Sequence, residues 1–69
     1  MTNTVLLEKK IRESGIKKSV ILERLNLSYQ GLSNKIKGKT AFKAYEISEI
    51  CDILKLSKID KESIFFASK

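Results

Sequence analysis

The sequence predicts a single all-α domain of five helices, and three observations lead to this prediction. Sixty-nine residues suffice for one small domain with a thin core. Apolar residues recur at helical spacing in several windows, and the chain contains no proline. We find no repeat, linker or low-complexity segment that would divide residues 1–69. The clearest apolar stripe, typical of a helix from about residue 45 to 54, is Ile47, Ile50, Cys51 and Leu54.

The first two predicted helices precede a sharp turn. Leu7 and Ile11 share one face of the first helix, and Gly15 is expected to end it as a C-terminal cap. The second helix is predicted over about residues 18–25 from the spacing of its apolar residues. Asn26 follows it, and asparagine accepts a left-handed backbone, so Asn26 can end this helix in a tight turn.

The third predicted helix begins after Ser28, whose hydroxyl can accept a hydrogen bond from a free backbone N–H as an N-cap. Leu32 and Ile36 are spaced i, i+4 on its buried side, and Gly38 can terminate it with a positive φ. A helix, a turn of three to four residues and a second short helix make up the helix-turn-helix plan. The second helix of this plan would span about residues 28–37.

The last segment, residues 57–69, is predicted to form a short fifth helix. Ser57 and Asp60 could each cap it, and the sequence leaves both alternatives open. Three apolar residues near its end either close the core or form a surface for a partner: Ile64, Phe65 and Phe66.

One cysteine and no histidine limit the chemistry of this chain. Cys51 cannot form an internal disulfide, and cysteine with carboxylates but without histidine is a poor zinc ligand set. Because Cys51 lies on the apolar stripe, we interpret it as a small core residue. Nothing in the sequence indicates an enzyme, so we expect no catalytic residue, no metal and no cofactor.

No stretch approaches the roughly 20 apolar residues of a membrane span, and residues 1–10 do not resemble a secretory signal. We therefore expect a soluble protein in the reducing cytoplasm.

Basic charge gathers in the middle third of the chain. The formal net charge is +6, and residues 24–45 contain five basic side chains and no acid. A basic segment of this kind is typical of a surface that binds a polyanion. The five side chains are Arg24, Lys35, Lys37, Lys39 and Lys43.

A helix in the major groove of DNA presents its N-terminal residues to the base edges. Gln30 and Asn34 would face outward on the third helix, and both side chains can bind adenine through two hydrogen bonds. Gly31 would leave space for a close approach to DNA. For Tyr29, contact with DNA and packing at the edge of the core are both open. The predicted base-contacting residues are Tyr29, Gln30, Ser33 and Asn34. The predicted phosphate contacts from this part of the chain are Ser28, Lys35, Lys37, Lys39 and Lys43.

The order and spacing of several short motifs resemble the helix-turn-helix family of temperate-phage repressors, the Cro/C1 or XRE-like group. These motifs are Leu25-Asn26-Leu27-Ser28, Leu32-Ser33-Asn34-Lys35-Ile36 and Gly38-Lys39. The resemblance implies a lambda-repressor-like fold of five helices and a phage or prophage transcriptional regulator that binds double-stranded operator DNA as a homodimer. It also implies that Lys18 contacts phosphate.

The chain departs from the pattern of this family at three positions. Lys17 stands where a threonine or serine usually caps the second helix, a substitution typically worth ~1 kcal/mol. Leu22 replaces a small alanine, and Asn26 replaces the turn glycine. An alternative function is a modulator or antirepressor of the same fold that binds a partner phage repressor. A third hypothesis is the antitoxin of a toxin–antitoxin pair.

Overall fold

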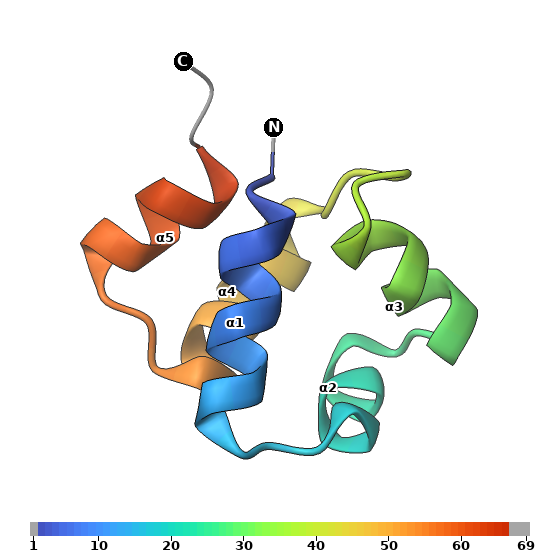
Figure 1. The fold of residues 1–69 in the computed structure, drawn as a ribbon. Coiled ribbons are helices and arrows are strands. Elements are labelled where there is room, and N and C mark those ends of the chain that lie inside the picture. Colours follow the sequence, from blue (N-terminus) through green and yellow to red (C-terminus); the bar gives the residue numbers. More distant parts are fainter. Residues whose placement is uncertain (1, 67–69) are drawn as a thin grey trace.

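The computed structural model describes residues 2–66, and these residues form five α-helices without a strand, as predicted. Helix α1 lies between α5 on one side and α3 on the other, with α4 behind it (Figure 1). Helix α1 packs against α3, α4 and α5, whereas α2 packs against α4. The helices are α1 (Thr4–Ser14), α2 (Lys18–Leu25), α3 (Tyr29–Ile36), α4 (Ala44–Leu54) and α5 (Lys58–Phe65).

The ends of the first two helices follow local sequence signals. Gly15 ends α1 with φ +73°, and Asn26 ends α2 with φ +57°, so both predicted left-handed caps are confirmed. Lys17 is the N-cap of α2 and makes no side-chain capping hydrogen bond, because a lysine side chain has no oxygen to accept one. Asn3 caps α1, because its side-chain oxygen accepts a hydrogen bond from the backbone N–H of Leu6 at 3.1 Å.

Helix α3 begins as predicted, and the start of α5 shows which of its two candidate residues act as caps. The Ser28 Oγ accepts a hydrogen bond from the backbone N–H of Gly31 at 3.0 Å. Ser57 and Asp60 both cap α5, since the Ser57 Oγ accepts from the Asp60 N–H while the Asp60 carboxylate accepts from the Ser57 N–H. Helix α5 ends at Phe65, and residues 67–69 of the predicted fifth helix lie outside the described residues.

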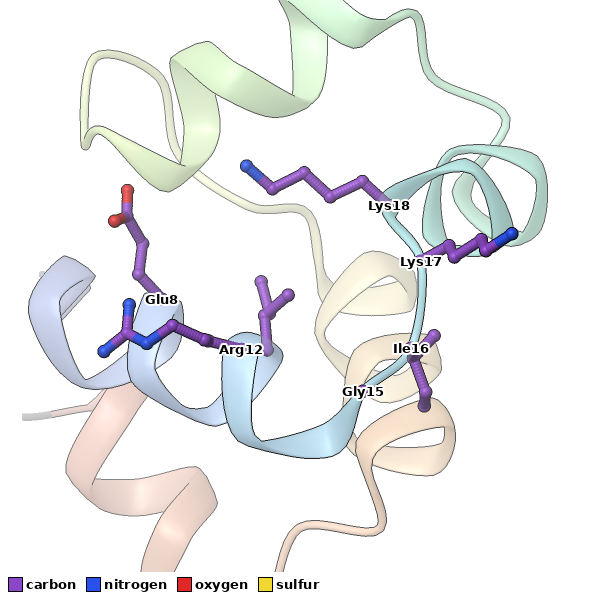
Figure 2. A pocket seen from close by; sticks show the side chains of 7 residues that line it. Glu8, Arg12, Gly15, Ile16, Lys17 and Lys18 are labelled. Carbon is purple, nitrogen blue, oxygen red and sulfur yellow. The ribbon is translucent and has the colours of Figure 1, made fainter.

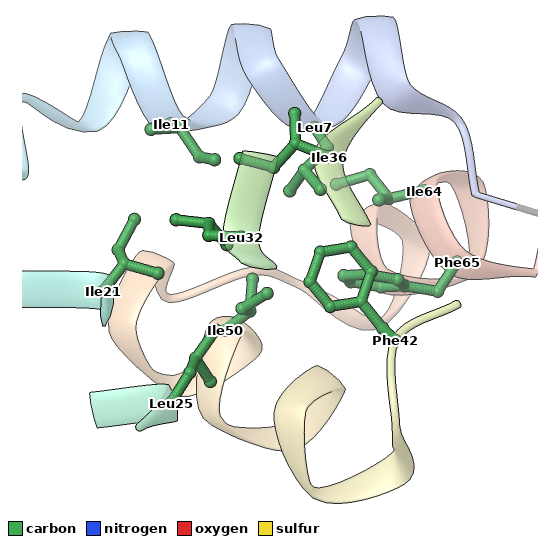
Figure 3. Close-up of a cluster of buried hydrophobic side chains, with 10 residues drawn as sticks. All are labelled: Leu7, Ile11, Ile21, Leu25, Leu32, Ile36, Phe42, Ile50, Ile64 and Phe65. Carbon is green, nitrogen blue, oxygen red and sulfur yellow. The ribbon is translucent and has the colours of Figure 1, made fainter. Parts of the chain in front are cut away.

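The core consists of apolar side chains from all five helices and from the segment between α3 and α4 (Figure 3). Ile64 and Phe65 are buried in it, so they close the core, while Phe66 remains 57% exposed. Cys51 is half-buried and packs against the core, and this burial raises the pKa of its thiol. The buried apolar residues are Leu7, Ile11, Ile21, Leu25, Leu32, Ile36, Phe42, Ile50, Ile64 and Phe65.

None of the helices between residues 2 and 66 combines the length and the apolar character needed to cross a membrane.

Candidate nucleic-acid interface

Helices α2 and α3 are joined by a corner of three residues, Asn26, Leu27 and Ser28. The backbone N–H of Leu27 donates to the carbonyl oxygen of Leu22 at 3.0 Å, which closes the last turn of α2. Leu27 is half-buried and packs against the core. Three local features determine where α3 begins relative to α2. They are the left-handed backbone of Asn26, this hydrogen bond and the N-cap of Ser28.

Gly31 faces the inside of this corner. A Cβ atom on Gly31 would lie 3.3 Å from the Ser28 Oγ and 3.7 Å from the Leu27 Cδ2. The missing side chain therefore relieves crowding where the first turn of α3 meets the corner. The expected close approach of Gly31 to DNA stays a prediction.

The first turns of α3 present the four predicted base-contacting residues. Tyr29 is 62% exposed and is not among the residues that pack against the core. The alternative that Tyr29 packs at the edge of the core is therefore wrong. Gln30 is exposed, whereas Ser33 and Asn34 are half-buried. The Gln30 Nε2 donates to the Asn34 Oδ1 at 3.0 Å, which couples the two amides across one helical turn. This bond leaves the Gln30 oxygen and the Asn34 nitrogen for other partners.

Lys35 does not lie on this surface, and its prediction as a phosphate contact is wrong. Its side chain is 11% exposed, and its Nζ donates to the Glu46 Oε1 of α4 at 2.7 Å. The same Nζ donates to the carbonyl oxygen of Ala41 at 3.1 Å. A lysine ammonium that is bound in this way is not available to a phosphate. The burial of Lys35 could have been predicted from the sequence, because Lys35 stands three residues after Leu32 and therefore lies on the buried side of the helix.

Glu46 is a buried charged residue whose burial was not predicted from the sequence. Burial opposes its ionised form, but hydrogen bonds from Lys35 and from the backbone N–H of Lys43 outweigh this effect, so the pKa of Glu46 lies below its ordinary value. Glu46 occupies the third position of α4, where a carboxylate commonly binds the backbone N–H of the N-cap residue. Its place three residues after the N-cap could have indicated this hydrogen bond from the sequence.

Arg24 is also paired with α4. Its guanidinium donates to the Glu49 Oε1 at 2.7 Å and to the Asp52 Oδ2 at 3.1 Å. These hydrogen bonds raise the pKa of Arg24. Two of the five basic side chains in residues 24–45 are thus neutralised by acids of α4. The remaining three are exposed and form no ion pair with any residue of the described range: Lys37, Lys39 and Lys43.

A second group of basic residues surrounds a pocket of about 460 Å³ between the end of α1 and the start of α2 (Figure 2). Lys18 and Glu8 extend into this region from opposite sides, whereas Lys17 points away from it. Arg12 and Ile16 complete the polar and apolar parts of its lining. Lys18, the phosphate contact implied by the family resemblance, is exposed at the first position of α2.

Comparison with protein families, curated proteins and solved structures finds no match to this chain.

Proposed function

We propose that this protein is a sequence-specific DNA-binding regulator of transcription. In this proposal α2 and α3 act as a helix-turn-helix, and α3 enters the major groove. The observation that carries it is the polar surface of α3, which begins directly after the corner and includes Gln30 and Asn34. Lys18 precedes this surface in the chain, and three exposed lysines without ion pairs in the described range follow it.

The chemistry of this surface fits the edges of base pairs. The major groove is about 12 Å wide and accepts one α-helix. Glutamine and asparagine amides carry a donor and an acceptor, which match the N6 and N7 atoms of adenine. The hydrogen bond between Gln30 and Asn34 holds the two amides in one relative orientation and lowers the entropy lost when they bind bases.

The lysines serve a different purpose from the amides. Contacts to phosphate determine the position and orientation of a protein on the duplex, while base contacts carry the sequence information. We assign the phosphate contacts to Lys18 before the corner and to Lys37, Lys39 and Lys43 after α3. The Ser28 hydroxyl accepts a bond from Gly31, and its proton can still be donated to a phosphate oxygen.

The resemblance to temperate-phage repressors extends the proposal. It supports a phage or prophage regulator that binds a two-fold symmetric operator as a homodimer. Because a dimer of this class places its two α3 helices in successive major grooves, the two half-sites would be about one DNA turn apart.

A binding titration tests the proposed function. The protein is titrated onto the DNA beside its own gene and onto a random duplex of equal length, each at two salt concentrations. We expect tighter binding to the first duplex and a decrease in affinity with salt, with a slope of about 0.9 in log K per neutralised phosphate. Equal affinity for both duplexes would contradict sequence-specific regulation.

Gln30→Ala or Asn34→Ala is expected to reduce discrimination between the operator and random DNA, because each base contact is worth about 1–3 kcal/mol. The measurement is the ratio of the two dissociation constants at one salt concentration. Ser48→Ala, on the exposed surface of α4, is the matched control and should leave the ratio unchanged. Equal losses on both duplexes would rule out base contacts by these amides.

Lys39→Ala is expected to weaken binding to all sequences alike. Removal of one phosphate contact lowers the salt slope by about 0.9, which corresponds to about fivefold in affinity at 0.15 M salt. Lys58→Ala removes the same charge from α5, on the other side of α1 from α3, and should have little effect on the slope. A decrease in affinity confined to the operator would contradict the phosphate assignment.

A protein partner is the second candidate function. Ile59 near the start of α5 and Phe66 directly after its end are 74% and 57% exposed, so two apolar side chains near α5 are accessible to a partner. If selective DNA binding fails and the protein forms a complex with a phage repressor encoded beside it, the modulator function replaces the regulator proposed above.

A further inference from the structure

We propose that the buried Lys35–Glu46 ion pair positions the second half of the segment 37–43, from Ala41 to Lys43, for contact with DNA phosphates. The pair itself is too deeply buried to reach DNA, so it would act through the backbone of this segment, which is called the α3–α4 connection below. This inference rests on the proposed function for its consequence in DNA binding, but the ordering of the connection can be measured separately.

The ion pair is bonded to the backbone on both sides of Phe42. The Lys35 Nζ donates to the carbonyl oxygen of Ala41 at 3.1 Å, and the Glu46 Oε1 accepts from the backbone N–H of Lys43 at 2.8 Å. The 2.7 Å bond between Lys35 and Glu46 joins these two contacts. The end of α3, the connection and the start of α4 are thus linked by one continuous set of hydrogen bonds.

Phe42, at the centre of these contacts, is anchored in the core. The Lys35 Nζ lies 5.9 Å from the centroid of the Phe42 ring. That ring meets Phe65 edge to face, with ring centroids 5.5 Å apart and an angle of 86° between the ring planes. The second half of the connection is therefore held by both polar and aromatic contacts.

The first half of the connection is held by α3 itself. The backbone N–H of Lys39 donates to the carbonyl oxygen of Asn34 at 2.8 Å, and the backbone N–H of Gly38 donates to the carbonyl oxygen of Lys35 at 3.1 Å. Gly38 adopts φ +84°, which lets the chain reverse immediately after the helix. These bonds do not depend on the ion pair, so the two halves of the connection can be perturbed separately.

The location of the ion pair explains why charged groups are used inside so small a core. A buried ion pair is often no more stabilising than apolar side chains of similar volume, because desolvation offsets the attraction. An apolar pair would fill the same space, yet it could not bind the Ala41 carbonyl or the Lys43 N–H. What the ion pair provides and an apolar pair would not is therefore a defined backbone conformation between Ala41 and Lys43.

The test compares the double variant K35M/E46M with the wild type. Two methionines preserve the approximate volume and leave no buried charge, so we expect the variant to fold with a Tm close to that of the wild type. Amide hydrogen exchange should then accelerate at least tenfold at Lys43, because the variant has no acceptor for its N–H. The Lys39 amide, which binds Asn34, should exchange at its wild-type rate and is the control within the same molecule.

DNA titration supplies the second readout. We expect the salt slope of K35M/E46M to fall by about 0.9 for each phosphate that the connection no longer binds. Each such phosphate should weaken binding to operator and random DNA alike by about fivefold at 0.15 M salt. Glu46→Gln keeps an oxygen that can accept from Lys35 and Lys43. It should therefore retain the protection of the Lys43 amide and the wild-type slope.

Each opposite result overturns the proposal. An unfolded K35M/E46M would contradict the premise that apolar side chains of similar volume can replace the pair, and with it the argument that the charges serve position. A folded variant with a protected Lys43 amide, or with an unchanged salt slope, would show that the connection does not depend on the pair. If the wild type binds no DNA, the proposed function fails, and the exchange rates still decide whether the pair orders the connection.

Discussion

Lys35→Met is expected to lower the free energy of unfolding by about 3–5 kcal/mol at pH 7, because it leaves the Glu46 carboxylate buried without its cation. The Glu46 side chain is only 2% exposed, so water cannot replace the missing ammonium. A domain of this size is stable by roughly 3–10 kcal/mol in total, at about 0.05–0.15 kcal/mol per residue. A single substitution would therefore remove a large share of the stability. Urea denaturation followed by circular dichroism measures the change.

The pH dependence identifies the cause of this destabilisation. In the wild type the pKa of Glu46 is lowered on folding, so its stabilising contribution is present above its unfolded pKa and is lost as the pH falls through the folded value. In Lys35→Met, burial without a cation raises the pKa of Glu46 instead. That variant is destabilised above the raised folded pKa and recovers as the pH falls through it. The difference in unfolding free energy from the wild type should therefore shrink from pH 7 towards the ordinary carboxyl pKa of 4.5.

K35M/E46M is the control for this experiment, since it has no buried carboxylate and should not show the recovery. A Lys35→Met variant as stable as the wild type at pH 7 would contradict the importance of the buried pair. A constant difference between pH 7 and 4.5 would show that Glu46 does not cause the destabilisation.

Phe65→Ala is expected to cost about 3–5 kcal/mol of unfolding free energy, as for other buried phenylalanines. Phe65 is 5% exposed and forms the edge-to-face contact with Phe42, so the substitution removes both buried apolar area and this aromatic pair. Because Phe65 is the last residue of α5, the substitution should also loosen the packing of α5 on the rest of the core. The same denaturation measurement applies.

Phe66→Ala is the matched control, because it removes the same side chain from the adjacent, exposed position. We expect a change within about 0.5 kcal/mol, the usual range for surface substitutions. If Phe65→Ala left stability unchanged but abolished self-association, Phe65 would belong to an interface and not to the core.

The sequence by itself determined the helices, because their boundaries depend on interactions within a few residues. Gly15 and Asn26 end helices through the backbone conformations that they accept, and Ser28 starts α3 through one local hydrogen bond. The spacing of apolar residues also predicted the buried side of α3 and the clearest stripe of α4. Even the choice between Ser57 and Asp60 was local, although both residues proved to act together.

Only the tertiary structure decided which charges are free for a partner. Arg24 is neutralised by acids 25 and 28 residues away, and Lys35 by an acid 11 residues away. No periodic pattern encodes such pairings, since they depend on how α4 packs against α2 and α3. Tertiary packing likewise separated buried Phe65 from exposed Phe66. The physical reason is the same in each case: local sequence determines the backbone of a helix, whereas the exposure of a side chain depends on what packs against it.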